Sequence, residues 1–199
     1  QLAPYLVRAG WTLEAFLSGP STQTLVISGA GHAIVAFRGA EVIAMPDVWR
    51  ALDMRLAQWN GDDAGSVHRG FMVALDEVWT ELVGVLDRLA ARRLPVWYAG
   101  YILGAGLAVL AAARRRPRAT YTYGAPRIGD QAFAQYMAGQ AIYRVVNEAD
   151  IVPNLPMRRW GYRHVGRLFF LDEEQGLCRE PSPAQTAACC RSSTWRWPW

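Results

Sequence analysis

The sequence contains no lysine, and all 21 of its basic residues are arginines. The formal net charge is only +4, and the arginines are scattered apart from a cluster at residues 114–118. A nucleic-acid site would need them on one face with exposed aromatic residues between them, so no nucleic-acid partner is expected. The exclusive use of arginine is typical of GC-rich coding DNA, from which we expect a bacterial source.

Long hydrophobic runs are also missing. A membrane-spanning helix needs about 18 or more consecutive apolar residues. The longest apolar stretch, residues 98–113, carries glycines and ends in arginines, which favours a buried strand followed by a buried helix. We therefore expect no transmembrane segment. We expect a soluble protein. The chain itself contains no recognisable signal peptide, and since a mature form or a fragment would look the same, its compartment, cytoplasmic or secreted, is left open.

Cysteine is scarce, and its placement excludes a cysteine-rich scaffold. Cys178, Cys189 and Cys190 all lie near the C-terminus, without metal-ligand spacing and without a nearby histidine. Free thiols are therefore expected rather than a disulfide framework or a zinc site. We expect no metal and no cofactor.

The remaining composition is that of a globular domain, with 52% hydrophobic and 19% charged residues. Strand-like and helix-like segments alternate, which predicts an α/β fold with a mostly parallel sheet and helices on both faces. Two short apolar runs around the turn at residues 29–31 predict an antiparallel hairpin near the N-terminus. The expected helices are 1–20, 47–59, 70–93, 103–115 and 130–139, and the expected strands are 24–28, 33–37, 94–99, 119–123, 142–146 and one or two within 162–171.

The periodic pattern stops at about residue 173. We therefore expect a domain over residues 1–172, possibly truncated, and an irregular tail over residues 173–199. The final segment, ACCRSSTWRWPW, has neither period nor charge balance. It is either a floppy tail or a sequence translated out of frame.

The most informative segment is the turn at residues 100–104, Gly-Tyr-Ile-Leu-Gly, which joins an expected strand to a helix of small residues. A G-x-S-x-G turn in this setting lifts a serine oxygen above a sheet, and its glycines are needed where strand and helix crowd each other. Here Ile102 stands at the serine position. Taken alone, the spacing favours a small-residue helix packed on a strand over a catalytic turn.

Further segments on both sides of this turn occur in the order typical of one family. The chain resembles the class 3 (fungal-type) lipases, which are serine ester hydrolases of the α/β-hydrolase fold. The matching segments are IVAFRGAE (34–41), VHRGF (67–71), GYILGAGLA (100–108), YTYGAPRIGD (121–130), RVVNEADIVPNLP (144–156) and YRHVG (162–166).

The resemblance implies roles for individual residues. Asp150 matches the acid of a Ser-Asp-His triad, which orients the histidine; the other interpretation of Asp150 is a loop cap. Ala40 and Leu103 match the oxyanion-hole positions, whose backbone N–H groups would bind the developing negative charge. Asp47 and Trp49 fall near a structural pair of the family. An acyl ester or lipid is the implied partner, and the oligomeric state is left open.

Two departures from the family pattern remove the chemistry. The first is Ile102, which has no oxygen nucleophile; Tyr101 beside it replaces a supporting histidine of the family. No histidine follows His164, although the family's catalytic histidine lies downstream of that strand. His32, His68 and His164 are interpreted as structural. We therefore expect an ester hydrolase homologue that is inactive as written; the alternatives are a lipid- or partner-binding pseudoenzyme and a fragment without independent function.

Overall fold

The computed structural model describes residues 3–38, 53–60, 64–147, 150–172 and 176–179. Its helices are α1 (Ala3–Arg8), α3 (Arg69–Ala91), α4 (Leu103–Arg114) and α5 (Gln131–Tyr136), with single 3₁₀ turns η3 (Val152–Asn154) and η4 (Arg158–Trp160). Its strands are β1 (Thr12–Ser18), β2 (Gln23–Gly29), β3 (His32–Phe37), β4 (Leu56–Gln58), β5 (Ser66–His68), β6 (Val96–Tyr101), β7 (Ala119–Tyr123), β8 (Ile142–Asn147), β9 (Arg167–Asp172) and β10 (Gly176–Arg179).

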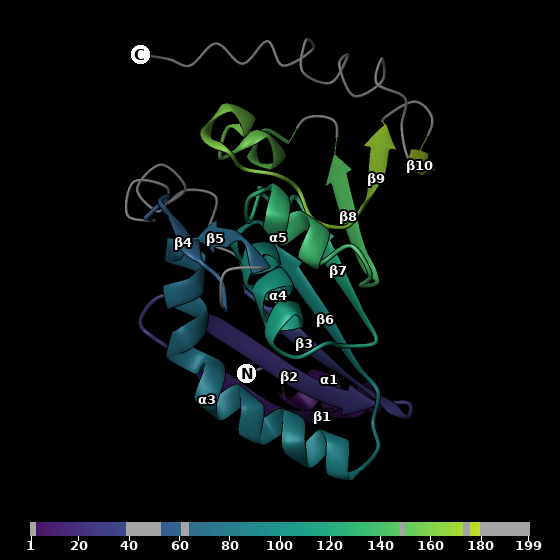
Figure 1. Cartoon of the computed structure of the whole chain (residues 1–199). Coiled ribbons are helices and arrows are strands. Elements are labelled where there is room, and N and C mark those ends of the chain that lie inside the picture. The colour runs from purple at the N-terminus through teal and green to yellow at the C-terminus, as the bar shows by residue number, and fades with distance from the viewer. Residues whose placement is uncertain (1–2, 39–52, 61–63, 148–149, 173–175, 180–199) are drawn as a thin grey trace, which may run out of the picture.

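An eight-stranded sheet forms the centre of the molecule, in the order β1-β2-β3-β6-β7-β8-β9-β10 (Figure 1). The five strands from β3 to β9 pair in parallel, whereas β1, β2 and β3 form an antiparallel meander. The expected α/β-hydrolase-like, mostly parallel sheet with an antiparallel hairpin at the N-terminal end is therefore confirmed. Strands β4 and β5 form a separate two-stranded ribbon.

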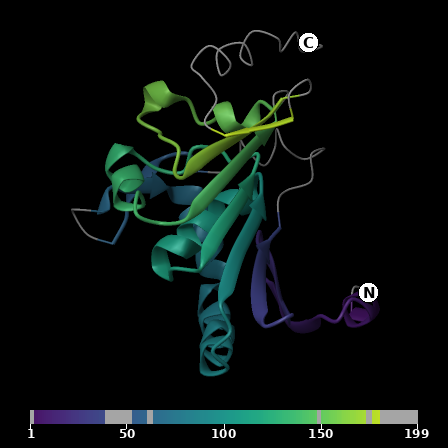
Figure 2. The same ribbon diagram turned by 90° about the vertical axis from the view of Figure 1, so that its right-hand side faces the viewer.

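The long helix α3 follows the apolar period expected from the sequence, and its inward stripe is fully buried. That stripe consists of Phe71, Leu75, Val78, Leu82, Val85, Leu86 and Leu89. Helix α4 lies between α3 and strands β3, β6 and β7 (Figure 2). The small residues of α4 make this close approach possible: a Cβ on Gly106 would lie 3.0 Å from the Phe71 ring. Within the described part of the chain, no helix is both long and apolar enough to cross a membrane.

Two of the expected helices are wrong, and the expected tail contains a strand that the sequence analysis did not predict. The helix expected over residues 1–20 is limited to α1, because residues 12–18 pair with β2 as an edge strand. Of the helix expected over 47–59, residues 47–52 lie outside the described residues, and 56–58 form β4, paired with β5. The tail expected from residue 173 contains β10, which pairs with β9. In each case the segment is a strand because it pairs with another strand. The spacing of apolar residues within the segment does not reveal this pairing.

Candidate active site

The expected strand-to-helix turn lies at Ile102, between β6 and α4. Ile102 has φ 53° and ψ −109°, a backbone region in which a β-branched residue is rare. Its N–H donates to the Tyr123 carbonyl over 2.9 Å, which fixes the turn against β7. Such a conformation costs about 1–3 kcal/mol and persists only where the surrounding structure imposes it.

The two glycines of the turn allow strand, helix and the end of β3 to touch. A Cβ on Gly100 would lie 2.1 Å from the Gly104 carbonyl oxygen, and a Cβ on Gly104 would lie 2.2 Å from the Phe37 carbonyl oxygen. Phe37 is the last residue of β3. The chain that leads to Ala40 therefore leaves the sheet directly beside the turn; Ala40, Asp47 and Trp49 themselves lie outside the described residues.

Leu103 is the first residue of α4, where the backbone N–H groups of a helix have no intrahelical acceptor. Its N–H makes no hydrogen bond to the described residues. Residue 103 therefore presents a donor at the amino end of a helix, the geometry that an oxyanion hole uses. The side chain beside it is not reactive, because Ile102 is a hydrocarbon and only 4% exposed.

Asp150 lies on the loop after β8 and faces the turn across Gly124. A Cβ on Gly124 would lie 2.4 Å from Asp150 Oδ2 and 3.5 Å from Ile102 Cγ1, so the carboxylate and the Ile102 side chain converge on one point. Gly124 has φ 58°, which favours glycine. Asp150 Oδ1 accepts a hydrogen bond from the Val152 N–H over 2.9 Å. The carboxylate therefore caps its own loop through Oδ1 while Oδ2 faces the Ile102 turn.

Burial raises the pKa of the Asp150 carboxyl above its usual range, and the Val152 N–H opposes this effect. A group whose folded-state pKa is raised destabilises the fold once pH rises above its unfolded-state pKa. Asp150→Asn is therefore expected to raise the melting temperature at pH 7, because Asn is uncharged and can keep the bond from Val152. Thermal unfolding followed by circular dichroism at pH 7 and pH 3.5 measures this. The gain should shrink at pH 3.5; a gain independent of pH would contradict the ionisation argument.

The three histidines do not complete a triad. Among the described residues, Asp150 accepts its side-chain hydrogen bond from Val152, and no histidine bonds to it. His32 lies between the rings of Trp11 and Trp97, with centroid distances of 5.0 and 5.1 Å. His68 is the N-cap of α3, where its Nδ1 accepts from the Phe71 N–H. Burial holds the pKa of His164 well below its usual value, and the guanidinium groups of Arg144 and Arg127 lower it further.

Two arginines near the Asp150 loop were missed by the sequence analysis. Arg127 donates from its backbone to the Leu155 carbonyl and from Nη1 to the carbonyl oxygens of Asn154 and Pro156, so it holds the loop that carries Asp150. Arg144 is 8% exposed on β8, and its Nε has no hydrogen-bond partner in the part of the chain that the structure describes. Burial lowers the pKa of Arg144 to about 10. Both lie in segments that resemble the family, but nothing in those segments distinguishes a loop anchor from a surface arginine.

Comparison with known proteins agrees with this geometry. The family model described as "Lipase (class 3)" matches residues 34–160, more than half of the chain. The lipase of Rhizomucor miehei is 38% identical over 122 residues, which cover 54% of this chain and 33% of the relative. Secreted mono- and diacylglycerol lipase 1 of Fusarium solani is 37% identical over 114 residues, which cover 53% and 34% of the two proteins. The matched region therefore spans about a third of the length of these curated relatives.

Solved structures show the same relationship. The triacylglyceride lipase of Rhizomucor miehei matches with a TM-score of 0.75 at 28% identity, covering 85% of this chain and 71% of that structure. A triacylglycerol lipase in which a serine protease triad forms the catalytic centre matches with a TM-score of 0.76 at 26% identity. The curated relatives named above are fungal, so they give no support to a bacterial source. The chain belongs to the class 3 lipase family.

Proposed function

We propose that this 199-residue chain is an acyl ester hydrolase homologue that does not hydrolyse esters in its present form. One observation carries the proposal: the nucleophile position of the strand-to-helix turn holds Ile102, which faces Asp150 with a saturated side chain. Acyl transfer by this kind of site requires a hydroxyl oxygen to attack the ester carbonyl while a base removes its proton. Asp150 alone supplies neither the attacking oxygen nor an imidazole.

The parts that the chain retains are the acid and the backbone framework. We propose Asp150 as the triad acid, Leu103 as an oxyanion-hole donor through its backbone N–H, and Ala40 as the second donor. These groups bind and orient an ester without cleaving it. Loss of a triad member leaves only about a thousand- to ten-thousand-fold acceleration over water, and the loss of a second member adds little because the members act as a unit.

The unmodified protein is expected not to raise the rate of p-nitrophenyl butyrate hydrolysis detectably above the buffer background, because the residual acceleration acts only on the small fraction of substrate that is bound. Ile102→Ser alone is expected not to rescue it. Serine is a weak nucleophile near neutral pH until a base takes its proton, and no histidine bonds to Asp150 among the described residues. Release of nitrophenolate, followed by absorbance, measures both proteins. Asp150→Ala in each background is the control.

Two outcomes would contradict this proposal. Turnover by the Ile102→Ser variant would show that a histidine present in this chain, His164 or His68, reaches the new hydroxyl. Turnover by the unmodified chain that Asp150→Ala abolishes would show a different nucleophile in the same site.

A second candidate function is binding of an acyl ligand without turnover. Tyr101 and Tyr123, which pair across β6 and β7, are 49% and 46% exposed beside the turn. Exposed aromatic side chains of this kind provide apolar contact area for a ligand bound beside the turn. Saturation-transfer NMR with tributyrin below its solubility limit tests this function: replacing both tyrosines with alanine should weaken the signal, whereas Tyr5→Ala, an exposed residue of α1, should not. An equal signal from all three proteins would exclude this site as the place of binding.

A further inference from the structure

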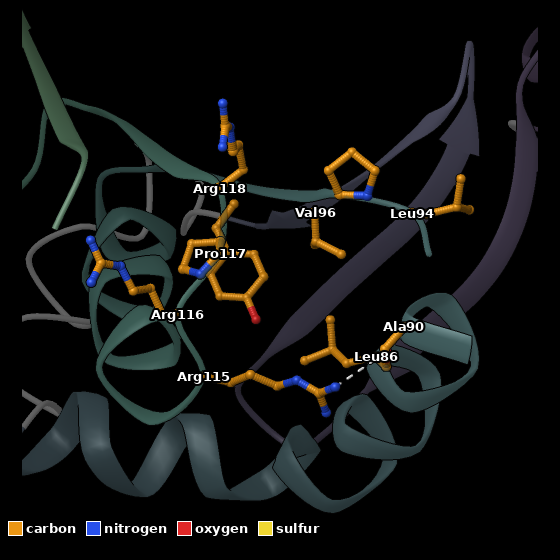
Figure 3. Close-up of a pocket in the computed structure, with 10 residues that line it drawn as sticks. Leu86, Ala90, Leu94, Val96, Arg115, Arg116, Pro117 and Arg118 are labelled. Carbon is orange, nitrogen blue, oxygen red and sulfur yellow. Dashed lines mark hydrogen bonds between the residues drawn. The ribbon is translucent and has the colours of Figure 1, made fainter. Parts of the chain in front are cut away.

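A cleft of about 430 Å³ lies at the amino ends of the parallel strands β6 and β7 (Figure 3). Val96 begins β6 there, and Ile102 follows the other end of the same strand. At about 3.3 Å per residue, the two ends are roughly 20 Å apart. The cleft is therefore separate from the candidate active site, and its volume falls within the range of about 300–1,000 Å³ typical of small-molecule sites.

One side of the cleft is apolar and the other is basic. Figure 3 shows Leu86, Ala90, Leu94 and Val96 on one side and the segment of residues 115–118 on the other. The polar side chains that line it are the phenol of Tyr98 and the guanidinium groups of Arg115, Arg116 and Arg118. Phenol and guanidinium groups can all donate hydrogen bonds, and guanidinium groups cannot accept them. Such a lining favours a ligand with an anionic acceptor group and an apolar body.

Several bonds hold the two sides together without a ligand. The Arg118 N–H donates to the Val96 carbonyl over 2.7 Å. Arg115 spans the cleft, because its Nη1 pairs with Asp87 Oδ1 at 2.5 Å and its Nη2 lies 3.5 Å from the Leu86 carbonyl oxygen. A ligand would therefore meet a formed cleft, which reduces the entropy lost on binding.

Two of the donors have no partner among the described residues. Tyr98 is 1% exposed, and its ring packs edge-on against Phe37 at 6.0 Å. Its hydroxyl makes no hydrogen bond to the described residues, and burial raises its pKa, so it stays protonated and able to donate. The Arg118 guanidinium likewise has no hydrogen-bond or ion-pair partner in the described chain, whereas Arg115 is paired with Asp87 and Arg116 donates to the Gly139 carbonyl over 2.8 Å.

We propose that this cleft is a second binding site, for an amphiphilic monocarboxylate. The alkyl chain lies on the wall formed by Leu86, Ala90, Leu94 and Val96. The carboxylate accepts hydrogen bonds from the Tyr98 hydroxyl and from Arg118, whose exposed side chain points away from the cleft in Figure 3 and turns inward when the ligand binds. Three arginines against the single carboxylate of Asp87 give the cleft a positive balance that attracts an anion.

The probe is sodium octanoate, with octanol and octylamine as its uncharged and cationic counterparts, and binding to the whole chain is measured by isothermal titration calorimetry. Octanoate is expected to bind with a Kd on the order of 0.1–1 mM, as a ligand of this size allows. Octanol should bind at least about tenfold more weakly and octylamine not detectably. Failure of octanoate to bind, or equal binding of octanol, would overturn the proposal.

Variants locate the site. Ala90→Trp fills the cleft from an exposed position on α3 and should abolish octanoate binding, whereas Ala91→Trp, one residue further and also exposed, should leave it unchanged. Tyr98→Phe and Arg118→Gln should each weaken binding about three- to tenfold. Melting temperatures verify that the variants fold. Binding that survives Ala90→Trp in a folded protein would place octanoate elsewhere and refute the cleft, whatever the outcome of the esterase assays.

Discussion

Gly104→Ala and Gly100→Ala are each expected to destabilise the protein by about 3–5 kcal/mol. The added methyl on residue 104 would lie 2.2 Å from the Phe37 carbonyl oxygen, and that on residue 100 would lie 2.1 Å from the Gly104 carbonyl oxygen. Real Cβ atoms do not approach backbone atoms this closely, so β6, α4 or β3 must shift. All three pack in the centre of the fold. Because small domains have about 5–15 kcal/mol of stability in total, such a loss approaches complete unfolding.

Gly84→Ala is the matched control. Gly84 lies within α3, and a Cβ there would meet only the end of the flexible Arg88 side chain at 3.9 Å. Alanine is the better helix former by about 0.5–1 kcal/mol, so this variant should be more stable than the parent. Urea denaturation followed by circular dichroism measures all three proteins. A loss below about 1 kcal/mol for both turn variants would mean that strand and helix can separate at the turn without cost.

The same crowding explains why the turn could be recognised from sequence. Gly100 and Gly104 are set by local geometry, since a strand that reverses directly into a helix leaves no room for side chains at those positions. Helix α3 could also be predicted from the sequence, because the helical spacing of its apolar residues lies within one continuous segment. The position of Asp150 opposite Ile102 followed from the resemblance of residues 144–156 to the family rather than from any pattern in the chain.

Features that depend on contacts between different segments of the chain could not be predicted from the sequence. Residues 12–18 carry Leu13 and Phe16 at a spacing that suits a helix, yet both are partly exposed on an edge strand, because pairing with β2 outweighed the local pattern. The close approach of Gly124 to Asp150, and the bonds from Arg127 to residues 154–156, join segments about 25 residues apart or more. Their residue types alone give no sign of these contacts.

The protein is expected to lose about 2 kcal/mol of stability between pH 7 and pH 5 through His68 alone. His68 is fully buried, and burial lowers its pKa to about 4, against the small opposing effect of Asp53. In the unfolded chain the imidazole titrates near pH 6.5. The unfolded state therefore binds more protons between these two values, and stability falls as pH drops from 6.5 towards 4.

The surroundings of His68 explain why the fold favours the neutral ring. Its Nδ1 accepts a hydrogen bond from the Phe71 N–H over 3.4 Å and so caps α3. Only the neutral imidazole can accept at that atom. Protonation would replace this bond with two opposed donors and would place a positive charge at the amino end of a helix, where the dipole disfavours it. The Nε2 atom is buried without a hydrogen-bond partner among the described residues, so it gives the charged ring no compensation.

The test compares the parent with His68→Asn by urea denaturation at half-unit steps from pH 7 to pH 5. Asparagine is a favoured N-cap that does not titrate, so the variant should lose stability more gently with pH even if it is less stable at pH 7. His164 contributes a fall of the same sign, because its pKa is also lowered by burial; His68→Asn combined with His164→Gln should therefore flatten the profile further. Asp53 and Glu14, whose pKa values are lowered by their arginine and serine partners, affect stability chiefly below this window. Parallel profiles for parent and His68→Asn would show that the ring at the start of α3 titrates in the folded protein as it does in the unfolded chain.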